Sequence, residues 1–275
     1  MKKSKTECIF ELATDKICQG GQKKVKDCNF GIKKTTMFVD DNLQKKIALA
    51  SGHYAYFDFD DILIFDIKAQ QYLASLLTKQ ILTLEKINKI TANKILVVGL
   101  GNAKYACDSL GSSVANKILV TTPYLDKKLF EPKDMARIYS LSFGVYGTTG
   151  IDSSQMICQI CKLIEPDLVI AIDSLVASNA KSLSHSIQMS DTKLSPGGGV
   201  GNQRQDLSRE TLGADVFAIG VPLVVNLGKK SGKEDLIVTS KDIEKHVSVL
   251  SKIIATAINK SFVFLPNDDY LRLVS

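Results

Sequence analysis

Several kinds of residue are scarce in this chain of 275 residues, and their scarcity argues against some classes of protein. Trp is absent and aromatic residues make up only 7% of the sequence, so an aromatic platform for nucleic acids has little support. No apolar run approaches the roughly 20 residues of a membrane-spanning helix. The apolar part of the N-terminal stretch is too short for a secretory signal peptide. With hydrophobic residues at 45% and charged residues at 23%, we expect a globular cytosolic protein.

Histidine and cysteine are too few or too scattered for several kinds of site. None of the three histidines lies in a nucleophile-plus-base context, and "SLSHS" around His185 is more typical of a surface strand or turn than of a catalytic triad. No G-x-S-x-G motif is present, so a Ser–His–Asp hydrolase and a zinc peptidase are both disfavoured. The single C-x-x-C pair, Cys158 and Cys161, lies among apolar residues at helical spacing. We expect these two thiols to be buried on a helix. We expect neither a cofactor nor a metal ion.

Positive charge is concentrated near the N-terminus. Residues 1–46 hold eleven Lys against six Asp and Glu, whereas the rest of the chain is close to neutral. Two interpretations are open: a basic arm that meets nucleic acid or an acidic partner, or a solvated Lys-rich tail. We favour the tail, so direct DNA binding is not our first expectation.

The hydrophobic pattern predicts alternating strands and helices. Residues 94–101 and 167–173 are continuous apolar runs, which is typical of central strands in a parallel sheet. A stretch that opens with Asp152 and Ser153 and stops before Pro166 predicts a capped helix. The other expected elements are strands at 31–39, 53–59, 117–122 and 215–222, and helices at 67–90, 107–116 and 239–262. We predict a single α/β domain with a central, mostly parallel sheet flanked by helices.

Two carboxylates follow the ends of the predicted central strands. Asp108 comes in the turn after the first strand, and Asp173 ends the second. Because ligands bind outside the carboxyl ends of parallel strands, both side chains are expected at one edge of the sheet. Two neighbouring carboxylates share protons unequally, so one acts as a base and the other as an acid, which suits water activation. The competing interpretation is that each aspartate only accepts hydrogen bonds from nearby backbone.

A glycine-rich stretch, "SPGGGVGNQRQDLS" at residues 195–208, is the most unusual in the chain. Gly197, Gly198 and Gly199 have no Cβ, so a substrate backbone can approach them closely. Asn202 and Arg204 would then orient the substrate or the loop itself. A purely structural hairpin is the alternative.

Several long blocks of the sequence resemble the germination protease family, the endopeptidases of bacterial spores. The strongest likeness is "IQMSDTKLSPGGGVGNQRQDLSRETLGADVFAIGVPLVV" at residues 187–225. "LVVGLGNAKYACDSLG", "LVTTPYLDKKLF", "GTTGIDSSQMI", "EPDLVIAIDSLVAS" and "DLIVTSKDIEKHVSVLSKIIATAIN" also match, in order along the chain. The family is similar in fold to the hydrogenase maturation proteases, so the resemblance implies a phosphorylase/hydrolase-like α/β fold.

The resemblance implies a specific function. Members of this family degrade small acid-soluble DNA-binding spore proteins when germination begins, inside the spore core or forespore, without a membrane and without a cofactor. They are homotetramers made as zymogens, which implies an N-terminal propeptide here at 1–15, cut near Thr14 and Asp15, and a protease domain at 16–275. Their catalytic aspartate pair corresponds by position to Asp108 and Asp173.

The sequence also departs from the family pattern. "AKYAC" precedes Asp108 where the family has a Trp and a Thr-Pro, and Ser112 replaces a proline. The segment after "GVPLVV" is short, and the N-terminal region is basic rather than acidic. The alternative function is therefore a catalytically divergent or inactive paralogue that acts as a binding protein. A metal-dependent protein is a weaker rival, with His185 as the nearest histidine, and Asp191 is expected to be structural.

Overall fold

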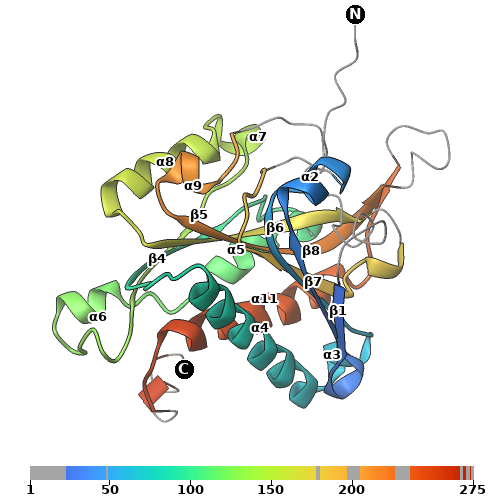
Figure 1. The fold of residues 1–275 in the computed structure, drawn as a ribbon, viewed down its shortest axis with the longest axis horizontal. Coiled ribbons are helices and arrows are strands. Elements are labelled where there is room, and N and C mark those ends of the chain that lie inside the picture. Colours follow the sequence, from blue (N-terminus) through green and yellow to red (C-terminus); the bar gives the residue numbers. More distant parts are fainter. Residues whose placement is uncertain are drawn as a thin grey trace, which may run out of the picture.

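A sheet of nine strands runs through the middle of the molecule, with helices packed on both of its faces (Figure 1). The computed structural model describes residues 23–47, 49–177, 180–196, 205–226, 236–266, 269, 270 and 273. The strands are β1 (Lys23–Asp27), β2 (Lys33–Val39), β3 (Gly52–Asp58), β4 (Lys94–Gly99), β5 (Arg137–Ser142), β6 (Leu168–Ala177), β7 (Ser186–Ser190), β8 (Asp215–Asn226) and β9 (Ile237–Val238).

The sheet is mixed, with a parallel half and an antiparallel half. Its strand order is β1-β2-β3-β7-β8-β6-β4-β5, and β9 pairs with β8. Strands β5, β4, β6 and β8 are parallel to their neighbours within this group. Strands β1, β2, β3 and β7 extend the sheet with antiparallel pairs. The prediction of a single α/β domain is confirmed, and the antiparallel half makes the sheet less parallel than expected.

The described helices form two layers. The α-helices are α2 (Asp41–Ile47), α3 (Ile62–Phe65), α4 (Ile67–Ile87), α5 (Leu110–Ala115), α6 (Thr122–Asp126), α7 (Tyr146–Thr149), α8 (Ser153–Ile164), α9 (Arg209–Leu212) and α11 (Ile243–Phe262). The short 3-10 helices are η1 (Asn29–Gly31), η2 (Ala106–Asp108) and η3 (Ala180–Ser182). Figure 1 shows α4 and α11 below the sheet and α8 and α9 above it. None of the described helices is long and apolar enough to cross a membrane.

Each face of the sheet has its own hydrophobic core. Alternate residues of β6 point to opposite faces, so Ile170 and Ile172 join the core under α4 and α11. Val169 and Ala171 join the second core, which packs against α8 and α9. Burial on both faces is the reason that β6 appears in the sequence as a continuous apolar run.

The structure confirms the predicted start of α8 but not that of α11. Asp152 caps α8, because its Oδ1 accepts hydrogen bonds from the backbone nitrogens of Ser154 and Gln155. Cys158 and Cys161 are buried on this helix, as predicted. The last helix, α11, begins only at Ile243, four residues after the predicted start at residue 239.

The predicted strand at 117–122 is wrong. These residues link α5 to α6 and are held by side chains instead of a strand partner. The backbone nitrogen of Leu119 donates to Asn259 Oδ1 at 2.9 Å, and the Thr121 hydroxyl donates to the Ala136 carbonyl at 2.6 Å. The strand beside β4 is β5, which the sequence did not predict.

Candidate active site

Asp173 lies near the carboxyl end of the parallel half of the sheet. It is half-buried on β6 and is the register partner of Gly220 on β8. Its Oδ1 accepts a hydrogen bond of 2.8 Å from the backbone nitrogen of Ser174. By strand alternation, its side chain points to the same face as Ala171, the face covered by α8 and α9.

Asp108 approaches the same edge from the neighbouring strand. It is the last residue of η2, a 3-10 helix that contacts both β6 and β8. Its Oδ2 accepts a hydrogen bond of 2.9 Å from the backbone nitrogen of Asn102, which is buried. The turn that carries Asp108 is fixed to β6, because the nitrogen of Leu100 donates to the Ile172 carbonyl at 2.8 Å. The structure thus places both predicted aspartates at one edge of the sheet.

Two glycines allow this turn to pack so closely. Gly101 has φ +98°, and a Cβ added there would lie 2.1 Å from the Asp108 carbonyl oxygen and 2.8 Å from its Oδ1. A Cβ on Gly111 would lie 2.3 Å from the Leu100 oxygen and 2.6 Å from the Ile172 oxygen. No side chain fits at either position, so the "GLGN" and "LG" motifs are needed for the position of Asp108.

The ends of the glycine-rich stretch lie on the same face as Asp173. Leu194 and Leu207 pair through two backbone hydrogen bonds, of 2.9 and 2.8 Å, and both belong to the core that contains Ala171. Asp206 joins the two ends, because one oxygen accepts from Ser195 Oγ and the other lies 2.7 Å from Lys193 Nζ. The predicted substrate-binding and processing residues lie outside the described residues: Gly197, Gly198, Gly199, Asn202, Arg204, Thr14 and Asp15.

A row of polar residues that the sequence did not single out extends from Asp173 across the sheet. Gly220 is also the register partner of Gln188 on β7, and Gln188 in turn is the partner of Tyr56 on β3. Partners in one row project from one face. Gln188 Nε2, Tyr56 Oη and Ser186 Oγ are buried and have no hydrogen-bond partner among the described residues. The alternating polar residues of "SIQMS" were the only signal of this row in the sequence.

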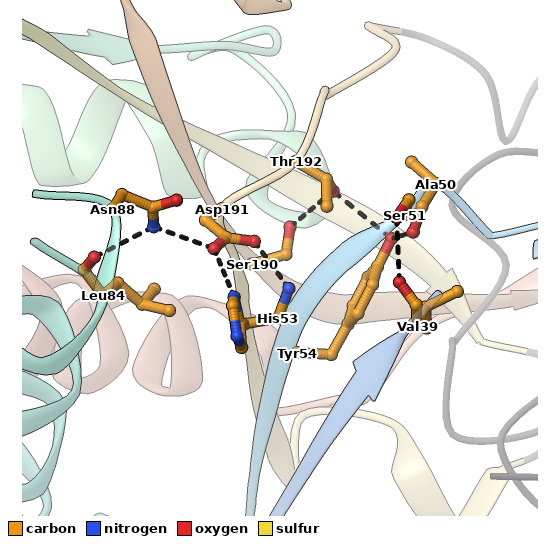
Figure 2. A network of polar contacts seen from close by, with 10 residues as sticks. All are labelled: Val39, Ala50, Ser51, His53, Tyr54, Leu84, Asn88, Ser190, Asp191 and Thr192. Carbon is orange, nitrogen blue, oxygen red and sulfur yellow. Dashed lines mark hydrogen bonds and ion pairs between the residues drawn. The ribbon is translucent and has the colours of Figure 1, made fainter. Parts of the chain in front are cut away.

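Asp191 belongs to a different network, shown in Figure 2. Its side chain is 5% exposed and accepts hydrogen bonds from His53 N at 2.6 Å and Asn88 Nδ2 at 2.9 Å, and its Oδ2 lies 2.7 Å from His53 Nδ1. Beside it, Tyr54 donates to the Ala50 carbonyl at 2.8 Å, and burial raises the pKa of Tyr54 to about 12. Three contacts to one buried carboxylate join β3, α4 and the end of β7, which agrees with a structural part for Asp191.

His185 lies on the wall of a cavity of about 460 Å³, which is also lined by Asp61 and His246. Its Nε2 lies 2.8 Å from Asp61 Oδ1 and its Nδ1 lies 2.6 Å from the Leu183 carbonyl oxygen. The His246 ring is 6.2 Å away, and burial lowers the pKa of His246. Across the described part of the chain, no three His, Cys, Asp or Glu side chains are arranged to hold a metal ion.

Comparison with known proteins identifies relatives of this chain. A family model described as germination protease matches residues 11–231. The germination protease of Oceanobacillus iheyensis is 36% identical over 227 residues, which are 80% of this chain and 60% of that protein. The germination protease of Clostridium tetani is 31% identical over 263 residues, with 78% of this chain and 80% of that protein covered. The chain spans 54% of the Bacillus cereus germination protease, at 36% identity.

A solved structure also shows a partial likeness. It is a NiFe hydrogenase maturation protease from Thermococcus kodakarensis, 19% identical, with a TM-score of 0.36. The match covers 61% of this chain and 94% of that protein.

Proposed function

Because this chain belongs to the germination protease family, we propose that it is an endopeptidase of germinating spores. Its substrates would be small acid-soluble proteins that bind DNA in the spore core. The observation that carries this proposal is the placement of Asp108 and Asp173 at one edge of the sheet, on η2 and on the strand that η2 contacts.

The chemistry proposed for this pair is the hydrolysis of a peptide bond by an activated water. One carboxylate takes a proton from water as the oxygen attacks the carbonyl carbon of the substrate. In this proposal the other carboxyl carries a proton, as one member of a close carboxylate pair does, and gives it to the leaving nitrogen when the C–N bond breaks. Asp108 and Asp173 are both candidates for the base.

Substrate binding and control are assigned to the segments that flank this pair. Gly197, Gly198 and Gly199 would let the substrate backbone approach, and Asn202 and Arg204 would hold it. The fixed ends of this stretch lie on the face to which Asp173 points, which supports a location beside the pair. We further propose a homotetrameric zymogen, activated by a cut near Thr14 and Asp15.

The test is an endopeptidase assay on a purified small acid-soluble spore protein. The assay compares wild type, a form that lacks residues 1–15, and the variants Asp108→Asn and Asp173→Asn. Asp27→Asn, on the exposed strand β1, is the control. Loss of the acid or the base is expected to lower kcat by at least about 100-fold. Circular dichroism establishes that all forms are folded.

Each outcome separates two functions. Cleavage that is lost in both active-site variants and kept in Asp27→Asn supports the protease. Cleavage that survives either active-site substitution overturns the two-aspartate mechanism. If no form cleaves but the wild type binds the spore protein, the chain is a binding paralogue, for which the altered "AKYAC" stretch before Asp108 is the motivating feature.

A further inference from the structure

One face of the antiparallel half carries an unbalanced group of lysines. We call it the basic face: Lys24, Lys26, Lys34, Phe38 and His53. The pairs Lys24–Thr36 and Lys26–Lys34 join β1 to β2, and Phe38 pairs with His53 on β3. Strand alternation therefore places these side chains on a single face. Lys24 and Lys26 are exposed, and Phe38 is 53% exposed.

The lysines of the basic face are arranged at a cost to folding. Lys26 and Lys34 are directly opposite each other, and like charges in that position destabilise an antiparallel pair. Burial lowers the pKa of Lys34; the nearby Cys28 thiol opposes this shift and the charge of Lys26 adds to it. On this face of β1, β2 and β3 there is no Asp or Glu to offset these charges.

The opposite face of the same strands is balanced. There, Lys33 lies between two register partners, Asp27 on β1 and Asp58 on β3. A Lys-rich edge that only discourages aggregation does not need its charges sorted in this way. One face thus carries positive charge alone, whereas the other carries a lysine opposite two aspartates, and this sorting indicates that the basic face meets an anion.

The far end of the basic face carries two neighbouring aromatic rings, which are tilted by 45° to each other. The Phe38 and His53 rings have centroids 4.7 Å apart, and Asp191 fixes the His53 ring through Nδ1 at 2.7 Å. Figure 2 shows this fixed ring on β3. Phe38 lies four residues along β2 from Lys34, which is about 13 Å in a strand. Lysines followed by the exposed Phe38 ring match a single nucleic-acid strand, in which phosphates alternate with planar bases.

We propose that the basic face binds single-stranded nucleic acid, with phosphates at Lys24, Lys26 and Lys34 and a base stacked on Phe38. An acidic peptide would satisfy the lysines but has no regular planar group for the aromatic end. A duplex would satisfy the lysines but keeps its bases stacked inside. The proposal does not depend on the proteolytic activity of the molecule.

The test is fluorescence anisotropy with a labelled oligo-dT strand, titrated with the full chain between about 50 and 200 mM salt. The variant Lys24→Gln/Lys26→Gln removes two charges from the basic face. The matched control, Lys23→Gln/Lys33→Gln, removes two charges from the opposite face, one on β1 and one on β2. A third variant, Phe38→Ala, removes the exposed ring. Thermal unfolding of each variant establishes that it is folded.

The expected results differ in kind between variants. Lys24→Gln/Lys26→Gln weakens binding at low salt by about 10-fold or more and lowers the slope of log affinity against log salt by about 1.4, from about 0.7 per phosphate on a single strand. The control pair changes affinity by less than about 2-fold. Phe38→Ala weakens binding by about 5-fold or more and leaves the salt slope unchanged, because stacking involves no charge.

Three outcomes overturn the proposal. The first is no binding of the strand by wild type at the lowest salt. The second is an equal loss of affinity in the two lysine pairs, since net charge alone would then explain binding. The third is unchanged binding by Phe38→Ala together with tighter binding of a duplex of the same length, which would assign the surface to double-stranded DNA.

Discussion

Gln188 and Asp173 lie in one row of the sheet, each a register partner of Gly220, which separates them and has no side chain. The space above Gly220 holds the Leu175 side chain, whose Cδ1 is 2.6 Å from an ideal Cβ position. A polar site at Gln188 therefore lies two strands, about 10 Å, from the proposed catalytic carboxylate. Buried polar atoms without partners are uncommon in folded proteins and are typical of functional regions.

Replacing Gln188 by Met should stabilise the fold. The Gln188 side chain is 4% exposed and its Nε2 has no partner in the part of the chain that the structure describes, a condition that costs about 1–3 kcal/mol. We expect Gln188→Met to raise the free energy of urea unfolding by about 1 kcal/mol. Gln80, also 4% exposed but not among the unpartnered atoms, is the control, and Gln80→Met should give no gain. A lower stability for Gln188→Met would show that the amide is satisfied by bound water.

A Cβ at Gly101 should displace Asp108. In Gly101→Ala the new atom would lie 2.1 Å from the Asp108 backbone oxygen, so the turn must move in addition to bearing the strain of φ +98°. Gly150 has φ +70° and no atom within 4 Å of its Cβ position, so Gly150→Ala isolates the backbone strain of about 1–2 kcal/mol. We expect Gly101→Ala to lose more stability than Gly150→Ala and to lose peptide cleavage as well. Equal losses in the two variants would mean that Asp108 tolerates the shift.

The central strands could be predicted from the sequence because each is marked by a local pattern of residues. The strands β4, β6 and β8 are buried on both faces, so each appears as a continuous apolar run. Strand β7 was not predicted; its five residues alternate polar and apolar types, which is typical of a strand with one face in solvent, yet all five are buried. The wrong strand at 117–122 has apolar residues too, but its Thr121 hydroxyl donates to the Ala136 carbonyl and accepts from the nitrogen of Ile138. Periodicity carries no information about such side-chain contacts.

The candidate site likewise has one part that the sequence predicts and one part that it does not. The edge shared by Asp108 and Asp173 followed from the rule for parallel strands, which needs only their order. The row that includes Gln188 depends on the register of antiparallel strands that are far apart in sequence. The basic face also depends on register, since the eleven lysines of residues 1–46 do not reveal how strands sort them. Pairing between distant segments is decided by turns and packing that a single sequence does not display.

Asp206 should control substrate affinity more than turnover. Its two oxygens contact Ser195 Oγ and Lys193 Nζ and so join the ends of the glycine-rich stretch. In Asp206→Ala this junction is lost, so we expect KM for the spore protein to rise by several-fold with little change in kcat. Asp215→Ala is the control, because its partner Arg209 is 73% exposed and its ion pair contributes little. A fall in kcat at constant KM would instead place Asp206 in the chemical step.

His246 should make the stability of the fold depend on pH. It is 7% exposed, and its Nδ1 has no partner among the described residues. Burial lowers its pKa from the ordinary value of 6.5; the neighbouring His185 and Lys245 lower it further, whereas Asp61 and Asp242 oppose them. The folded state therefore keeps His246 neutral at a pH where the unfolded chain is already protonated.

The sign of the effect follows from proton binding. Below about pH 6.5 the unfolded chain binds more protons at this site than the folded chain, so stability falls as the pH decreases towards the lowered pKa of the folded state. The difference in Tm between pH 7.5 and pH 5.5, measured by calorimetry in wild type and in His246→Phe, isolates this contribution, since phenylalanine places an aromatic ring at the same position and does not titrate. We expect the variant to lose less Tm on acidification than wild type. An equal loss in both proteins would mean that the acid sensitivity arises at other groups, because a residue that does not titrate cannot contribute to the slope of stability against pH.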